Sequence, residues 1–179
     1  MTPRREGAGQ SGRPPGRFES AERFVAAMAR AATAVSVVTS DGPAGRFGLT
    51  VSAITSVSAE PPLMLACIKR RNPLPAAIEA NGVMAVNVLG EGQQHIADVF
   101  AGRSPGPNYD FGRAEWCRAV TGSPLLIGAA AVFDCELDAI HDAGSHRILI
   151  GRVVEARCGE ALPLVYARRG YRGIADLDL

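Results

Sequence analysis

A run of small hydroxyl side chains early in the chain could bind a flat ligand along its edge. Five of them fall within nine residues, at positions Thr50, Ser52, Thr55, Ser56 and Ser58. Side chains alternate faces along a strand, so Ser52 and Ser56 would share a face that Thr55 does not. A solvent-facing strand is the alternative, although residues 49–59 carry none of the charged side chains usual on such a strand. Small hydroxyls let a flat ligand approach the backbone and form hydrogen bonds there.

A cluster of cations follows the next apolar segment. KRRNP, residues 69–73, comes directly after the apolar run 63–68 and before a short helix that begins near Pro73. Free N–H groups at a helix N-terminus, with Lys69, Arg70 and Arg71 beside them, suit a phosphate group. A solvated basic turn is the alternative. The short Pro61-Pro62 link favours the phosphate interpretation, because it places this segment next to the hydroxyl-rich stretch.

A single histidine could act at the start of a later strand. His146 lies in GSHR, residues 144–147, between a glycine turn and an apolar strand. No Asp or Cys stands at the spacing of a catalytic triad, so a structural or exposed histidine is the alternative. The sequence also lacks a nucleophile elbow, paired carboxylates and a cluster of metal ligands, so we predict no metal site. Demanding chemistry would then belong to a cofactor that the protein binds and orients.

The elements that must position these residues are mostly strands. The spacing of apolar residues predicts helices at 21–32, with Ser20 as its cap, at 74–80 and at 91–102. Strands are expected at 34–39, 47–60, 63–68 (buried on both faces), 83–89, 128–138, 146–156 and 163–167, with a loop-rich segment at 103–124. Turns are expected at Asp41-Gly42 and Asn81-Gly82. Short links between strands predict an antiparallel barrel with peripheral helices rather than a parallel sheet.

Composition sets limits on the function. The chain has 179 residues, 47% of them hydrophobic and 21% charged, and a net charge of +1. That balance does not favour nucleic acid or an anionic membrane as a partner. We interpret residues 1–17, rich in Gly, Pro and Arg, as a disordered tail before a domain at 18–179. Four cysteines without a C-x-x-C pair indicate reduced core thiols in a cytoplasmic protein.

Several segments in fixed order resemble a known family. They include TSDGPAGRFGLTVSAITSVSAEPPLMLACIKRRN, NGVMAVNVLGEGQQHIADVFAG, GSHRILIGRVVEA and LVYARRGYRGI, within residues 20–174. Together they are similar to the short-chain NAD(P)H:flavin oxidoreductases, the reductase components of two-component flavin monooxygenases. The resemblance implies a mainly β fold, an FMN-binding split β-barrel of Greek-key topology with peripheral α-helices, working as a homodimer.

The resemblance also implies residue roles. His146 would be the catalytic residue, beside the nicotinamide. The flavin-binding residues would be Thr50, Val51, Ser52, Ala53, Thr55, Ser56, Cys67, Ile68, Lys69, Arg71, Asn72, Phe100, Ala101 and Tyr171. Because Thr55 falls on the opposite face from Ser52, a bulge near Ile54 or contacts through backbone groups would be required.

The implied reaction is hydride transfer from NADH or NADPH to FMN or FAD. The reduced flavin would pass, by diffusion, to a partner monooxygenase. Two alternatives stay open: a reductase of a bound non-flavin acceptor such as a corrin, and a non-enzymatic flavin- or haem-binding module of the same barrel.

Overall fold

The computed structural model describes residues 21–107 and 109–174. The predicted tail at 1–17, the start of the domain at 18 and the Ser20 cap lie outside these residues. The helices are α1 (Ala21–Met28), α2 (Leu74–Asn81) and α3 (Gln94–Phe100), with a 3-10 turn at Phe111–Arg113. The strands are β1 (Thr33–Ala34), β2 (Ser36–Ser40), β3 (Phe47–Val51), β4 (Ile54–Ala59), β5 (Pro62–Lys69), β6 (Val83–Val88), β7 (Trp116–Cys117), β8 (Leu125–Leu126), β9 (Ala131–Ala143), β10 (His146–Cys158), β11 (Val165–Ala167) and β12 (Gly170–Arg172).

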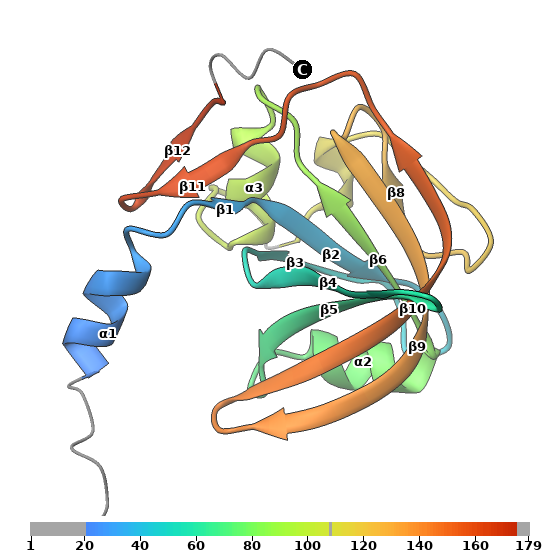
Figure 1. Cartoon of the computed structure of the whole chain (residues 1–179). Helices are drawn as coiled ribbons and strands as arrows, with labels where there is room; N and C mark the ends of the chain where they lie inside the picture. Colours follow the sequence, from blue (N-terminus) through green and yellow to red (C-terminus); the bar gives the residue numbers. More distant parts are fainter. Residues whose placement is uncertain (1–20, 108, 175–179) are drawn as a thin grey trace, which may run out of the picture.

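One antiparallel sheet of seven strands dominates the molecule. Its order is β3-β2-β6-β9-β10-β5-β4. Figure 1 shows this sheet curled into a barrel, with α2 and α3 on its outside. Three hairpins (β2–β3, β4–β5 and β9–β10) supply three of the six strand pairs, and α2 carries the chain from β5 across to β6. The predicted mainly β, antiparallel barrel with peripheral helices is therefore confirmed.

The hydroxyl-rich stretch closes this barrel. β3 and β4 follow one another in the chain, yet they are the two edge strands of the sheet. Ser52 and Ala53 form the link between them, and the N–H of Cys67 donates to the carbonyl of Ala53 at 2.9 Å. The prediction of one strand over 47–60 is therefore wrong. At Ser52 the chain leaves its pairing with β2 and begins a new pairing with β5.

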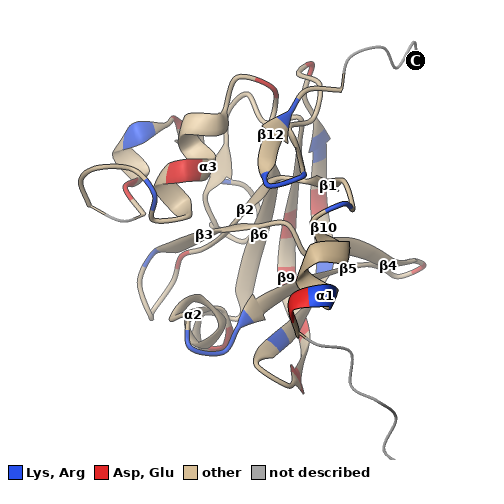
Figure 2. Cartoon of the chain, turned by 90° about the vertical axis from the view of Figure 1, so that its left-hand side faces the viewer, with Lys and Arg blue, Asp and Glu red and all other residues tan. Residues whose placement is uncertain are grey.

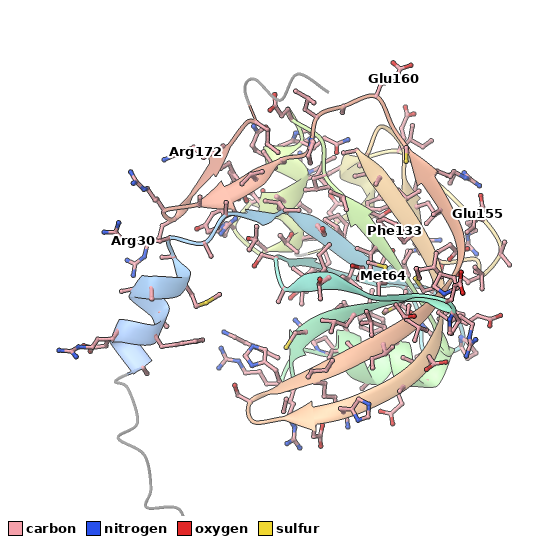
Figure 3. The ribbon with its side chains drawn as sticks, in the orientation of Figure 1. Arg30, Met64, Phe133, Glu155, Glu160 and Arg172 are labelled. Atoms are coloured by element: carbon pink, nitrogen blue, oxygen red, sulfur yellow. The ribbon has the colours of Figure 1, made fainter. Side chains whose placement is uncertain are left out.

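Two buried apolar clusters fill the fold. One includes Val37, Ala85 and Phe100 under α3, and the other includes Val38, Met64 and Leu149 next to α2. Figure 3 labels Met64, which is buried in the second cluster, and Phe133, which is half-buried and packs against that cluster. No helix in the described residues is long and apolar enough to cross a membrane.

One predicted boundary and one predicted burial pattern are wrong because of contacts with distant parts of the chain. The first helix ends at Met28 rather than at residue 32, because Thr33 and Ala34 pair with β11. The segment 63–68 is not buried on both faces: Met64, Ala66 and Ile68 are buried, while the alternate residues are half-buried. That second face of β5 borders surface hollows instead of the core.

The segment 103–124 contains more structure than its composition predicts. Phe111 and Trp116 pack with Phe100, at ring-centroid distances of 5.0 and 5.6 Å from it. Trp116 also pairs with Leu126 across β7 and β8. Contacts among aromatic rings of this size favour a fixed loop, and Tyr109 of this segment lines the site described next.

Candidate functional site

A cleft of about 670 Å³ lies where the barrel closes, and we name it the closure cleft. Its volume falls in the range of small-molecule sites, about 300–1,000 Å³. It is lined by Leu49, Thr50, Val51, Ser52, Ala53, Cys67, Ile68, Lys69, Arg71, Asn72, Pro73, Ala101, Tyr109 and His146. The structure therefore brings together most of the predicted site residues, from β3, β5, the turn before α2 and the start of β10.

The hydroxyl wall of the closure cleft has one fixed and one free side chain. Thr50 Oγ1 donates to the carbonyl of Ala97 in α3 at 2.7 Å, which ties β3 to that helix. Ser52 is exposed, and no described residue forms a hydrogen bond with its hydroxyl. Ser52 can therefore offer both a donor and an acceptor to a ligand.

The basic turn offers a ligand positive charge from its side chains, and few backbone N–H donors from the start of α2. Asn72 Oδ1 accepts from the N–H of Leu74 at 2.9 Å, and Pro73 and Pro75 have no N–H to offer. The expectation of several free donors at this helix N-terminus is therefore wrong. The cations remain, since Lys69 and Arg71 line the closure cleft and have no carboxylate partner in the described part of the chain.

His146 lies beside this turn through two fixed contacts. In the register of β10 and β5, His146 is opposite Lys69. The N–H of Arg70 also donates to the carbonyl of Ser145 at 3.0 Å. Ser145 Oγ lies 2.9 Å from Nδ1 of His146, and Nε2 has no partner among the described residues. The imidazole is thus half-buried, oriented by its neighbour and able to bind a ligand through Nε2.

Three of the predicted flavin-binding side chains lie away from the closure cleft. Phe100 is 0% exposed and packs in the core, so it supports the cleft from beneath. Thr55 and Ser56 come after the link at Ser52 and Ala53 and line a different hollow, of about 360 Å³, which we name the β4–β5 groove. The two sets are separated because residues up to Val51 belong to β3, which pairs with β2, whereas Thr55 and Ser56 belong to β4, which pairs with β5.

Tyr171 lines a neighbouring hollow of about 190 Å³, the tyrosine pocket, which shares Thr50, Ser52 and Ala101 with the closure cleft. Its hydroxyl donates to Asp98 Oδ1 at 2.8 Å. Arg103 donates to the same hydroxyl and pairs with Asp98 at 2.9 Å. Burial, together with the hydrogen bond to Asp98, raises the pKa of Tyr171 to about 12. The phenol is therefore neutral and fixed in place.

Sequence reasoning missed several residues that line the closure cleft and the tyrosine pocket, and four of them illustrate why. Leu49 and Pro73 line the closure cleft, and each is adjacent in sequence to a predicted site residue. Tyr109 and Arg103 come from the loop-rich segment, where no periodic pattern points at the site. Tyr109 has a left-handed backbone, with φ of 61°, and only the fold brings it to the cleft.

Comparison with known proteins relates this site to a family. Residues 28–175 match the flavin reductase like domain family. An FMN reductase (NADH) RutF of Ancylobacter novellus is 40% identical over 157 residues, 87% of this chain and 86% of that protein.

Two solved structures have the same fold. One is an NADH:FAD oxidoreductase of Streptomyces globisporus in complex with NAD and FAD fragments, with a TM-score of 0.80 and 28% identity over 88% of this chain and 94% of that one. The other is the styrene monooxygenase flavin reductase of Pseudomonas putida S12, with a TM-score of 0.75 and 27% identity over 87% and 99% of the two chains. Together with the barrel and its closure cleft, these matches establish that the chain belongs to the flavin reductase like domain family.

Proposed function

We propose that this protein is an NADH-dependent FMN reductase. The observation that carries the proposal is the convergence of a hydroxyl edge, a basic turn and an oriented histidine in one cleft. Membership of the family, and a relative named FMN reductase (NADH) over 87% of the chain, support the choice of co-substrate and acceptor.

The residues present fit a flavin mononucleotide. Ser52 and the backbone of Ala53 would face the edge of the ring system, where flavins carry hydrogen-bonding atoms. Lys69 and Arg71 would pair with the phosphate, since charge-assisted bonds to phosphate are the stronger class of hydrogen bond. Cys67 and Ile68 would pack along the molecule between those ends. Bound there, FMN supplies the hydride acceptor.

The chain's own residues bind and orient, and no general base is required. His146 would hold the nicotinamide ring through Nε2 against the face of the flavin. Orientation of two reactants in one site can lower a barrier by about 7–11 kcal/mol. Ser52 and nearby backbone N–H groups would stabilise the negative charge that develops during reduction.

The reduced flavin has a use outside this chain. A structural neighbour is the flavin reductase of styrene monooxygenase, which supports a flavin-dependent monooxygenase as the partner here. The open closure cleft suits release of the flavin and transfer by diffusion. Relatives named FMN reductase give no support to a corrin acceptor or to a non-enzymatic haem- or flavin-binding module.

We also propose a homodimer. The apolar side of α1 is uncovered in the single chain, with Phe24 61%, Val25 52% and Met28 51% exposed. Val57, 48% exposed, lies beside the apolar β4–β5 groove. A second copy could cover both surfaces, and light scattering that gives a monomer mass at working concentration would refute this.

A cytoplasmic location is proposed because all four cysteines are free thiols.

The direct test is NADH oxidation with added FMN, followed at 340 nm under anaerobic conditions. We expect bleaching of the flavin absorbance and turnover that depends on FMN. A matrix of NADH or NADPH against FMN or FAD would give the preferred pair. Pure protein that leaves both NADH and NADPH unoxidised with either flavin would overturn the proposal.

A further inference from the structure

Most of the described lysine and arginine side chains have a carboxylate partner, and those without one lie in particular parts of the fold. Ion pairs with carboxylates hold Arg46, Arg70, Arg103, Arg113, Arg118, Arg147, Arg152 and Arg157. Arg23 has a partner as well. The described cations without a carboxylate partner fall in two places. Lys69 and Arg71 line the closure cleft, and the others are Arg30, Arg168, Arg169 and Arg172.

Three of these arginines, Arg30, Arg168 and Arg169, form what we name the arginine corner. They line one hollow of about 440 Å³ with Ala26 and Ala29 of the α1 segment. The N–H of Arg168 donates to the carbonyl of Ala29 at 2.7 Å, so this contact fastens the β11–β12 turn against the end of α1. In Figure 2 this turn is blue beside the label β12, and in Figure 3 Arg30 and Arg172 both lie at this edge of the molecule.

The backbone of the turn is unusual for the residues it carries. Ala167 pairs with Gly170, so Arg168 and Arg169 are the two central residues of a tight hairpin. Their φ angles are 50° and 59°, both in the left-handed region. Hairpin turns of this type favour Asn, Asp and Gly, because other side chains are strained there. An outlier of this kind suggests a role for the arginine side chains.

The arginine corner connects with the proposed site through the same hairpin. Tyr166 and Tyr171 pair across β11 and β12, and both line the tyrosine pocket that shares Ser52 with the closure cleft. At about 3.3 Å per residue, the turn lies about 7 Å beyond Tyr166 along the strand. A ligand that extends from the closure cleft past these tyrosines would reach three guanidinium groups that have no carboxylate partner within residues 21–107 and 109–174.

We propose that the arginine corner binds the adenosine diphosphate half of a dinucleotide whose other end lies in the closure cleft. Guanidinium groups pair with phosphate oxygens in a bidentate manner, and an anion relieves the repulsion among three like charges. The inference rests on the proposed function, because NADH and NADPH carry this half and FMN lacks it. Lys69 and Arg71 then hold the phosphate of the flavin, and the arginine corner holds the diphosphate of the nicotinamide dinucleotide.

The test compares matched variants that lose two charges each. In Arg168→Asn/Arg169→Asn, asparagine tolerates the left-handed turn and removes both cations. The control is Arg113→Gln/Arg152→Gln, two exposed arginines that line none of the four hollows described above. Arg30→Gln removes the third cation without any change in the hairpin. Calorimetric titration with ADP-ribose measures the corner directly, whether or not the protein oxidises NADH.

We expect the hairpin variant to weaken ADP-ribose binding at least tenfold, which is about 1.4 kcal/mol. Arg30→Gln should weaken it less, and the control pair should bind as the wild type does. A parallel rise in the KM for NADH identifies the co-substrate as the ligand. ADP-ribose that fails to bind the wild type, or binds all variants equally, overturns the proposal.

Discussion

His146 lies directly opposite Lys69 in the register of β10 and β5. The nearest hydrogen bond between the two segments, from the N–H of Arg70 to the carbonyl of Ser145, fixes that arrangement. Strand pairing thus places the residue proposed to hold nicotinamide beside the residue proposed to hold the flavin phosphate. The functional groups lie on paired strands, which are more rigid than loops.

Replacement of His146 by alanine should impair the use of NADH more than the binding of FMN. Loss of one hydrogen bond of about 0.5–1.5 kcal/mol would lower kcat/KM for NADH by about 2- to 13-fold. Steady-state kinetics and flavin fluorescence quenching measure the two effects separately. His141→Ala is a suitable control, because His141 is exposed on the paired strand β9. A collapse of FMN affinity with normal hydride transfer would contradict the proposed role.

Arg71 and Arg70 are neighbours with different surroundings. Arg71 lines the closure cleft, and Arg70 instead pairs with Asp142 at 3.6 Å. We expect Arg71→Gln to weaken the binding of FMN by about 10- to 100-fold, which corresponds to the loss of a hydrogen bond to a charged group. The affinity for riboflavin, which has no phosphate, should change little. Arg70→Gln should leave both affinities unchanged. Equal losses for FMN and riboflavin would show that Arg71 does not contact the phosphate.

The link between β3 and β4 separates two sets of hydroxyls, and a pair of variants tests this separation. Ser52→Leu places a bulky side chain in the closure cleft, so we expect FMN binding to fall at least about tenfold, or about 1.4 kcal/mol. Thr55→Val removes a hydroxyl from the β4–β5 groove and should leave FMN affinity unchanged. Titrations followed by flavin fluorescence measure both. The reverse order of effects would move the site to the groove.

Gly48 allows β3 to approach the aromatic cluster. A Cβ at this position would lie 2.5 Å from Cε1 of Phe100 and 3.2 Å from Cζ of Phe111. Gly48→Ala should therefore destabilise the fold by about 1–3 kcal/mol through overpacking. For a domain of this size each kcal/mol lowers Tm by about 2–4 °C. If the clash is the cause, Phe100→Leu in the same chain should restore part of the loss, as a double-mutant cycle would measure.

The phenol of Tyr171 should titrate unusually late. Its pKa is raised to about 12 from an ordinary value near 10, because burial and the contact with Asp98 favour the neutral form. The resulting stabilisation is complete below pH 10 and is lost as the pH rises from 10 to 12. Absorbance at 295 nm should contain a late phenolate step that Tyr171→Phe abolishes. A complete titration by pH 10.5 would contradict the buried hydrogen bond.

Some elements of the fold could be predicted from local sequence patterns, and others could not. The antiparallel barrel followed from short links between apolar runs, and the C-cap at Gly82, with φ of 71°, followed from the local pair Asn81-Gly82. Local spacing gave wrong boundaries at the C-terminal end of α1 and at Ser52. At both points, pairing with a strand distant in the sequence replaces the local preference. The positions of Tyr109 and Arg103 were not predictable either, since an irregular loop has no period to read.

The sequence by itself determined which residue types were available: uncharged hydroxyls, a basic turn, one histidine before a strand and two adjacent arginines after the last predicted strand. Tertiary structure alone decided which of them meet. Closure of the sheet between β3 and β4 brings Ser52 to Cys67 and Lys69, and turns Thr55 and Ser56 toward another hollow. The physical reason is that side-chain direction along a strand depends on where pairing begins and ends, and long-range hydrogen bonds fix those points.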